Sequence, residues 1–162
     1  MFKLFGKKTP TEVFVAPVTG QLIPIEKVDD EVFSQKIMGE GFAVVPTENQ
    51  IYSPVAGTVK SIFPTKHALG ITTKNGLEVL VHMGLDTVEL EGKPFSELVK
   101  EGDQVEAGQP LMQMDLDTVQ QMGKPTTIVI VITDSDKLQD IPTITEKEIT
   151  HGDQVGQFSL HK

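Results

Sequence analysis

The chain has 162 residues, a length that favours one compact domain. Its 14 Lys and Arg residues are outnumbered by 23 Asp and Glu residues, and the net charge of -9 disfavours binding to nucleic acid. The absence of cysteine excludes a disulfide framework, a thiolate metal site and a cysteine nucleophile. No apolar run approaches the roughly 20 residues that cross a bilayer, and no secretory signal is recognisable, so we expect a cytoplasmic protein.

Short apolar runs rich in Val, Ile and Thr alternate with scattered Gly and Pro residues along the chain. Such runs are typical of an all-β fold, here an antiparallel β-sandwich or barrel-sandwich with a few short helical turns. In chain order we expect a strand over 13–15, a helical turn over 29–36, strands over 42–45 and 79–81, helical turns over 94–100 and 116–122, and a strand over 126–133.

We expect a flexible N-terminal tail over residues 1–12 and one domain over residues 13–162. The first eight residues mix apolar and basic side chains, which fits either a disordered tail or a short amphipathic anchor on an anionic membrane. Gly6 and the short length of this segment favour the tail.

Two short motifs occur twice. Ala-Pro-Val-Thr-Gly at 16–20 returns as Ser-Pro-Val-Ala-Gly at 53–57, and Gly-Asp-Gln-Val at 102–105 returns at 152–155. Both are built from turn residues, and their shared order predicts a duplicated half-motif within one domain.

Two of the four histidines, His67 and His82, flank a hairpin signal at Asn75-Gly76. If these two residues form a two-residue loop, Leu69 faces His82 and His67 faces Gly84. Both histidines then lie on one face of the hairpin, with Cα atoms roughly 7–8 Å apart. Imidazole rings at this spacing are able to converge on one small group.

The same register places Leu69, Ile71 and Leu80 on the histidine face and directs Val79 and Val81 to the other face. Apolar side chains therefore occupy both faces. We expect one face to pack in the core and the other to border a docking surface for a protein partner.

Several chemistries are disfavoured by what surrounds this pair. His82 and Asp86 have an H-x-x-x-D spacing, but a catalytic zinc needs three protein ligands and no third well-placed histidine is present. A G-x-S-x-G elbow and a Gly-rich phosphate loop are also missing. Two interpretations remain: strand histidines that are hydrogen-bonded in place, or a nucleophilic imidazole that accepts a phosphoryl group while the second histidine stabilises its charge.

Several ordered motifs carry a family resemblance: Val15-Ala-Pro-Val-x-Gly20, residues 30–37, Ser53-Pro-Val-x-Gly-Thr58, Ile62-Phe-x-Thr-x-His-Ala68 and Val81-His-x-Gly-x-Asp-Thr-Val-Glu-Leu90. With them, nearly the whole chain resembles the glucose-type enzyme IIA of the bacterial phosphoenolpyruvate-dependent sugar phosphotransferase system. The resemblance implies a β-sandwich with two-fold-related halves.

It also implies a role for each site residue. His82 would accept a phosphoryl group from the phosphohistidine of HPr, through Nε2 in this family, and pass it to a cysteine on the IIB domain of a sugar permease. His67 would stabilise the phosphoryl group, and Thr65 would support it by a hydrogen bond. No cofactor is implied, although both histidines could supply an intersubunit zinc with a kinase partner. Contact with the membrane would be peripheral, through the permease.

The resemblance further implies an apolar docking surface with an acidic rim that steers a basic partner and raises the pKa of the histidines. Leu80 and Met83 differ from the phenylalanines of the best-studied enterobacterial members. The partner-binding residues implied by matching positions are Asp30, Val32, Phe33, Phe63, Leu80, Asp86 and Val88.

Two other classes of protein remain as alternatives. Residues 101–111 look like the turn region of biotinyl and lipoyl carrier domains, but residues 112–115 lack the modified lysine. Lys74 does lie at a hairpin turn. A degenerate zinc peptidase of duplicated architecture is the other alternative.

Overall fold

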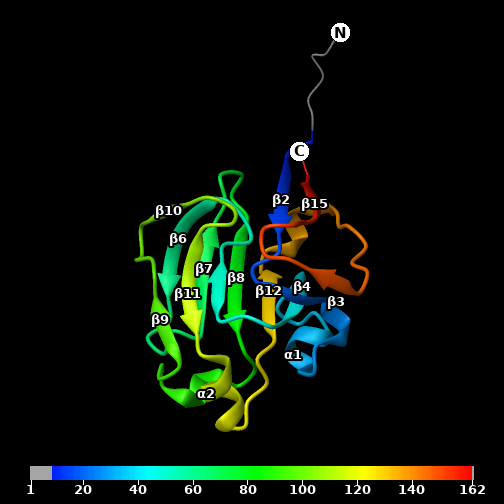
Figure 1. Cartoon of the computed structure of the whole chain (residues 1–162). Helices are drawn as coiled ribbons and strands as arrows, with labels where there is room; N and C mark the ends of the chain where they lie inside the picture. Colours follow the sequence, from blue (N-terminus) through cyan, green and yellow to red (C-terminus); the bar gives the residue numbers. More distant parts are fainter. Residues whose placement is uncertain (1–8, 162) are drawn as a thin grey trace.

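An antiparallel sheet of eight strands runs through the computed structural model, which describes residues 9–161 (Figure 1). Its order is β10-β6-β7-β8-β12-β4-β3-β14, and the sheets β5-β11-β9 and β13-β15-β2 complete the two halves. The all-β prediction is therefore confirmed. The strands are β2 (Thr11–Val15), β3 (Gly20–Pro24), β4 (Glu40–Pro46), β5 (Gln50–Tyr52), β6 (Gly57–Ile62), β7 (Ala68–Thr72), β8 (Glu78–Met83), β9 (Phe95–Glu97), β10 (Gln104–Val105), β11 (Pro110–Met114), β12 (Ile128–Ile132), β13 (Leu138–Asp140), β14 (Lys147–Ile149) and β15 (Gln154–Leu160).

Short helices join the strands. Two are α-helices, each begun by an aspartate whose carboxylate accepts a backbone N–H: Asp30 caps α1 and Asp115 caps α2. These helices confirm the predictions for 29–36 and 116–122. The helical elements are η1 (Ile25–Lys27), α1 (Glu31–Ser34), η2 (Thr87–Leu90), α2 (Leu116–Gln121) and η3 (Ser135–Lys137).

Two predicted segments need correction. The helix predicted over 94–100 is wrong, because Phe95 buries its ring and Phe95–Glu97 pairs with β11 as strand β9. Tertiary pairing here overrides the local signal of a proline at a first helical position. At the N-terminus, β2 begins at Thr11, two residues inside the expected tail, and pairs with β15. The predicted tail or anchor over residues 1–8 lies outside the described residues.

The first repeated motif marks a pseudo-two-fold relation between the halves. Each copy turns the chain from one strand into the next, from β2 into β3 and from β5 into β6. The copies also exchange equivalent backbone hydrogen bonds: Val15 N donates to the Pro54 carbonyl at 2.8 Å, and Tyr52 N donates to the Pro17 carbonyl at 2.7 Å. The prediction of a duplicated half-motif is confirmed by this pair of bonds.

The second repeated motif does not follow the same relation. Turn 152–153 exchanges two backbone hydrogen bonds with Ala16, the first residue of the first motif. The turn that makes the same two bonds with Ser53 is 108–109, whereas turn 102–103 bonds to β6. The similarity of 102–105 to 152–155 therefore reflects a shared turn type and not equivalent positions in the two halves.

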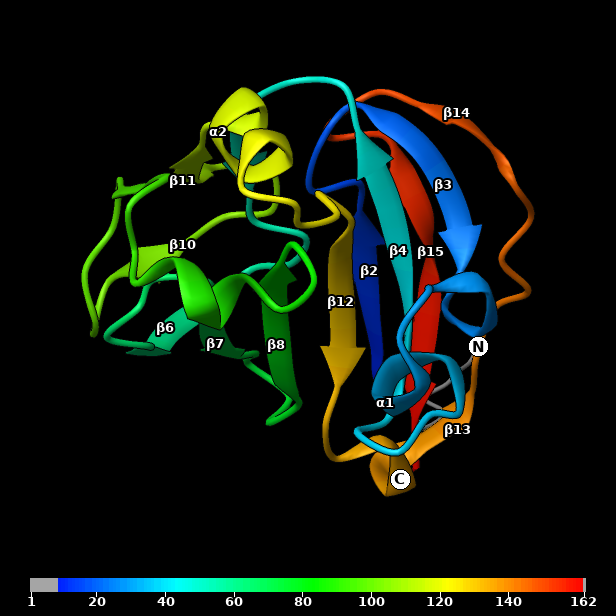
Figure 2. The ribbon, with the colours of Figure 1, turned by 90° about the horizontal axis from the view of Figure 1, so that it is seen from below.

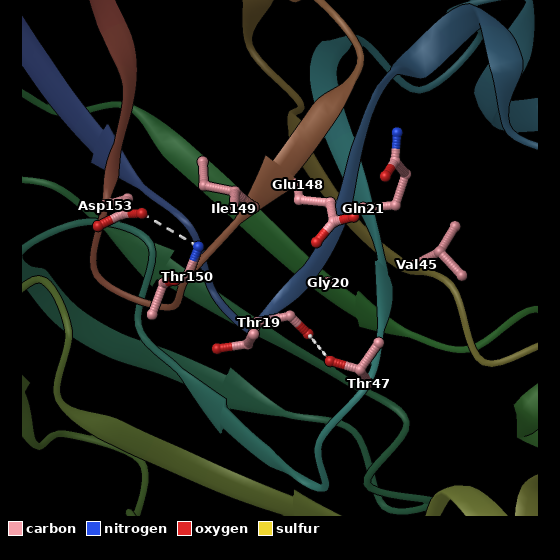
Figure 3. Close-up of a pocket in the computed structure, with 9 residues that line it drawn as sticks. All are labelled: Thr19, Gly20, Gln21, Val45, Thr47, Glu148, Ile149, Thr150 and Asp153. Carbon is pink, nitrogen blue, oxygen red and sulfur yellow. Dashed lines mark hydrogen bonds between the residues drawn. The ribbon is translucent and has the colours of Figure 1, made fainter.

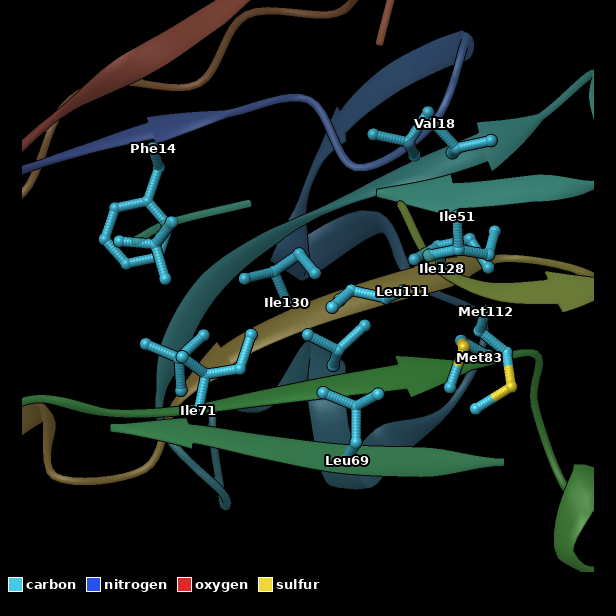
Figure 4. Packing of buried hydrophobic residues seen from close by; sticks show 14 of the residues in the cluster. Phe14, Val18, Ile51, Leu69, Ile71, Met83, Leu111, Met112, Ile128 and Ile130 are labelled. Carbon is cyan, nitrogen blue, oxygen red and sulfur yellow. The ribbon is translucent and has the colours of Figure 1, made fainter. Parts of the chain in front are cut away.

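The central strand β12 is buried along its whole length because it has a hydrophobic cluster on each face. The larger cluster fills the space between the sheets, and Figure 4 shows part of it, including Phe14 and Ile130. In this cluster the rings of Phe14 and Phe158 pack at a tilt of 59° with centroids 4.7 Å apart. The smaller cluster lies on the opposite face, where η1 and α1 cover it. Figure 2 shows β8, β12 and β4 side by side at the centre.

The duplication also produces two equivalent hollows at the sheet edges. One, of about 410 Å³, lies beside β3 and β14 and includes Thr19, Thr47 and Glu148 (Figure 3). The other, of about 750 Å³, lies at the corresponding place beside β6 and β10. Because both follow from the repeated strand arrangement, neither by itself indicates a ligand site.

Two glycines on one cross-strand row differ in what an added side chain would meet. A Cβ on Gly41 would overlap the carbonyl oxygen of Ile130, which belongs to the backbone. A Cβ on Gly70 would meet the Ser61 hydroxyl at 3.1 Å, a side-chain group that is able to rotate away, and the Val79 carbonyl oxygen at 4.0 Å. We expect Gly41→Ala to lower the free energy of unfolding by about 1–3 kcal/mol, and Gly70→Ala to change it little. Urea unfolding of both variants measures the difference, and equal losses would contradict this packing.

Candidate functional site

The two predicted histidines do meet. Their ring centroids are 5.1 Å apart, and the rings are nearly perpendicular at 79°. His82 lies near the end of β8, and His67 immediately precedes β7, so one hairpin supplies both rings. The predicted proximity of the pair is confirmed, but the register that led to it is not.

The hairpin loop has three residues between Thr73 and Leu77, not two. Thr73 N donates to the Leu77 carbonyl at 2.9 Å, and Gly76 N donates to the Thr73 carbonyl at 2.9 Å. This is the three-residue loop in which glycine takes the left-handed position. Every later pair shifts by one residue, so Ala68, and not Leu69, faces His82.

The shift corrects the predicted faces. Leu69 and Ile71 point into the larger core with Val79 and Val81, whereas Leu80 shares the face of His82. His67 still reaches that face because it stands outside the regular strand, directly after Lys66, whose φ of 60° lies in the left-handed region. Two effects that the sequence does not show, a longer loop and a break before β7, thus offset each other.

A backbone carbonyl fixes the protonation pattern of His82. The Nδ1 atom lies 2.8 Å from the carbonyl oxygen of Gly84, and a carbonyl only accepts hydrogen bonds. Nδ1 therefore carries the proton in the neutral ring, and Nε2 keeps its lone pair. This is the form of imidazole that is able to act as a nucleophile through Nε2.

A hydroxyl group holds the second ring. Thr65 Oγ1 lies 2.6 Å from His67 Nδ1, as the expected site role of Thr65 requires. His67 is only 6% exposed, and the Phe63 ring packs edge-on against it with centroids 5.3 Å apart. The ring is thus held in orientation, with Nδ1 occupied and Nε2 left for other partners.

The two halves of the fold contribute different connections to the site. Between β3 and β4, residues 25–39 form η1 and α1 and bring the ring of Phe33 to within 5.0 Å of the His82 ring centroid. At the equivalent place between β6 and β7, the short connection 63–67 supplies His67. The site therefore lies between two connections, 25–39 and 63–67, that occupy equivalent places in the two halves but differ in length and structure.

The pKa of His82 is lowered to about 4, chiefly by burial and secondly by the charge of the neighbouring His67. The hydrogen bond to Gly84 and the charges of Asp30 and Asp86 act in the opposite direction. Burial also lowers the pKa of His67. The expected influence of the acidic residues is present, but the expected net rise is wrong because desolvation outweighs it.

The expected partner-binding residues separate into two groups by exposure. Val32, Phe63 and Val88 are 42–49% exposed, so their apolar side chains are available to a partner. Phe33 and Leu80 are buried beneath the site at 4% and 9% exposure. Asp86 is exposed, and Asp30, which caps α1, is partly so.

Sequence reasoning missed the most informative partner of His82. Gly84 acts through its carbonyl oxygen, and a backbone acceptor leaves no mark in the residue type. The signal that the sequence does offer is the glycine itself, two residues after the histidine. Gly84 adopts a positive φ of 81°, which glycine readily takes in such a turn.

Within residues 9–161, no three His, Cys, Asp or Glu side chains gather where they would hold a metal ion. A zinc ion on His67 and His82 would therefore need ligands from a second protein, and the absence of a cofactor remains a prediction. No helix in this part of the chain is long and apolar enough to cross a membrane.

Comparisons with known proteins agree on one family. The family model for the phosphoenolpyruvate-dependent sugar phosphotransferase system, EIIA 1, matches residues 12–138. The chain is 44% identical over 154 residues to the glucose-specific EIIA component of Staphylococcus aureus (strain COL), with 93% of each chain covered. It is 45% identical over 142 residues to that of Staphylococcus epidermidis (strain ATCC 12228 / FDA PCI 1200), with 86% of each covered. Glucose permease IIA from Mycoplasma capricolum shares the fold with a TM-score of 0.83 and 34% identity, over 96% of this chain and 99% of that chain.

The lowered pKa of His82 predicts a specific pH dependence. Between pH 6.5 and about 4, the unfolded chain binds a proton at this residue that the folded protein does not bind. The free energy of unfolding should therefore fall as the pH falls through this window, and less steeply in His82→Gln.

Titration of the His82 ring by NMR measures the pKa directly. We expect a midpoint near 4, and a still lower midpoint in Asp86→Asn because a charge that favours the imidazolium is removed. A midpoint at or above the ordinary value of 6.5 would contradict the role of burial.

Proposed function

The chain belongs to the EIIA 1 family of the phosphoenolpyruvate-dependent sugar phosphotransferase system, and we propose that His82 is the residue on which it carries the phosphoryl group. Like its family, the protein is a phosphocarrier in sugar uptake that takes the group from HPr and passes it to the IIB domain of a sugar permease. The observation that supports His82 is its 2.8 Å hydrogen bond from Nδ1 to Gly84, because this bond leaves the Nε2 lone pair free.

Each transfer is a displacement at phosphorus. The Nε2 lone pair of His82 attacks the phosphorus of the HPr phosphohistidine, a new N–P bond forms, and the donor N–P bond breaks with its electron pair returning to the donor imidazole. In the second transfer, a cysteine thiolate of IIB attacks, the S–P bond forms, and the N–P bond to His82 breaks. The Nδ1 proton stays on the ring throughout, hydrogen-bonded to Gly84.

His67 is placed to stabilise the charge of the phosphoryl oxygens. When the Thr65 hydroxyl donates to Nδ1 of His67, the ring proton lies on Nε2, which is then a hydrogen-bond donor. The 5.1 Å separation of the ring centroids leaves this donor beside the group carried by His82. A fixed donor in a partly desolvated site stabilises developing negative charge better than water does.

Burial supports the same role for His82. A nucleophilic imidazole has to be neutral, and a pKa of about 4 keeps His82 unprotonated at neutral pH. Asp30 and Asp86 limit this lowering, so the ring nitrogen stays more basic than burial alone would make it.

The exposed surface around the histidines is proposed as the docking site for both protein partners. Val32, Phe63 and Val88 form its apolar part, and Asp30 and Asp86 form an acidic rim that would steer a basic partner. Phe33 and Leu80, which the family resemblance implied as contacts, are buried, so we propose that they support the site from beneath.

The two alternative classes of protein considered from the sequence are disfavoured. Membership of the EIIA 1 family argues against a biotinyl or lipoyl carrier and against a degenerate zinc peptidase. The cytoplasmic location and additional regulatory partners remain predictions.

Phosphorylation by phosphoenolpyruvate, enzyme I and HPr tests the roles of the two histidines. Intact mass should show one acid-labile phosphoryl group on the wild type and none on His82→Gln. We expect His67→Gln to accept the group but to transfer it to IIB at least tenfold more slowly, since one charge-stabilising donor is lost.

The matched control is His151→Gln, because His151 stacks on Tyr52 with centroids 4.0 Å apart and lies outside the site. This variant should behave as the wild type. A phosphoryl group on His82→Gln, or none on His151→Gln, would overturn the assignment.

Val88→Lys tests the proposed docking surface. A charge on an exposed apolar contact should raise the KM for phosphorylated HPr about tenfold, which corresponds to about 1.4 kcal/mol of binding free energy. Ile141→Lys is the control, because Ile141 is 42% exposed in the connection between β13 and β14. Similar KM values for the two variants would show that Val88 is not part of the docking surface.

A further inference from the structure

Two consecutive peptide groups follow His82, and each is hydrogen-bonded at both ends. The group between Met83 and Gly84 accepts from Thr87 Oγ1 at 2.6 Å and donates through Gly84 N to the Thr127 carbonyl at 2.8 Å. The group between Gly84 and Leu85 accepts from His82 Nδ1 at 2.8 Å and donates through Leu85 N to a carbonyl in the connection after α2 at 3.1 Å. The carbonyl that sets the His82 tautomer thus belongs to a constrained turn.

Besides the ring of His82 itself, Thr87 holds this turn through its side chain. It is fully buried, and its hydroxyl donates to the carbonyl of Met83, which lies at the end of β8. Its methyl group also occupies the space beneath Gly84, where a Cβ would overlap Thr87 Cγ2. Thr87 therefore contacts the turn from below by both branches of its side chain.

We infer that Thr87 is a positioning residue for the phosphoryl-accepting histidine, on the basis of the function proposed above. Its hydroxyl fixes the peptide plane between Met83 and Gly84, and the next plane is then directed so that the Gly84 carbonyl faces His82 Nδ1. Thr87 does not touch the reacting atoms. It acts on the Nε2 lone pair only through the tautomer that Gly84 selects.

The alternative role for Thr87 is stability alone. A buried threonine that loses its hydroxyl leaves the Met83 carbonyl without this partner, which by itself lowers the free energy of unfolding by about 1–3 kcal/mol. Stability therefore does not separate the two roles, whereas the protonation pattern of the His82 ring does.

The test uses full-length protein with 15N-labelled histidine and correlates the ring nitrogens with the ring protons. In the wild type we expect Nδ1 to be protonated and Nε2 to be unprotonated at pH 7. In Thr87→Val a substantial fraction of His82 should change to the Nε2–H tautomer. Phosphorylation by HPr should then slow about tenfold, the size of effect seen when a group that orients a metal-ligating histidine is lost. Thr87→Ser keeps the hydroxyl and should retain the wild-type tautomer.

Thr73→Val is the matched control. Thr73 is also buried, and its hydroxyl accepts a backbone hydrogen bond from Leu77 N at 3.1 Å at the far end of the same hairpin. It should lose stability without any change in the His82 spectrum. Should Thr87→Val not fold, Thr87→Ala removes the same hydroxyl with less steric demand, and the same spectra apply.

A wild-type tautomer and a wild-type rate in the folded Thr87 variants that lack the hydroxyl would overturn the positioning role. This failure is distinct from failure of the proposed function. If wild-type protein shows the Nδ1–H tautomer but is not phosphorylated on His82, the phosphocarrier assignment fails while the effect of Thr87 on the tautomer is still measured.

Discussion

The hydrogen bond from His82 Nδ1 to the carbonyl oxygen of Gly84 is the interaction on which the chemistry of this protein depends. It selects one of the two neutral tautomers of the ring, so that the ring has a defined donor and a defined lone pair. Burial acts on the same ring by disfavouring its protonated form. Together the two effects leave a neutral ring whose Nε2 lone pair is not engaged by the turn.

The position of His82 has an equivalent in the other half of the duplicated fold. Strands β8 and β12 are equivalent strands of the two halves, and they pair with each other about Val81 and Ile130. His82 follows Val81 by one residue, so its counterpart is Val131, which follows Ile130 by one residue. Val131 belongs to the smaller hydrophobic cluster. One half thus uses this position for packing and the other for chemistry. The difference arises outside the common strands, in the connections that cover this face: residues 25–39 bring Phe33, and residues 63–67 bring His67.

Much of the fold was predictable because local patterns and tertiary packing agree there. The apolar runs at 42–45 and 79–81 became central strands, and the aspartate-led segments became α1 and α2. The helix predicted over 94–100 failed because the burial of Phe95 in a strand pairing is not visible in its neighbours.

The site was predictable in its residues more than in its geometry. Asn75-Gly76 is compatible with both two-residue and three-residue loops, and only the packing of Leu69 and Ile71 in the core decides between them. The orientation of His82 depends on a backbone carbonyl, which no residue type encodes. Phe33 was expected at the surface because its position in a short helix does not show that its ring packs against His82.

The position of the phosphoryl group on the His82 ring tests this account most directly. NMR of the 15N-labelled, phosphorylated protein detects the coupling between phosphorus and each ring nitrogen. Because Nδ1 is held by Gly84, we expect phosphorus on Nε2 with the Nδ1 proton retained. Phosphorus on Nδ1, or on His67, would contradict the assignment of Nε2 as the acceptor.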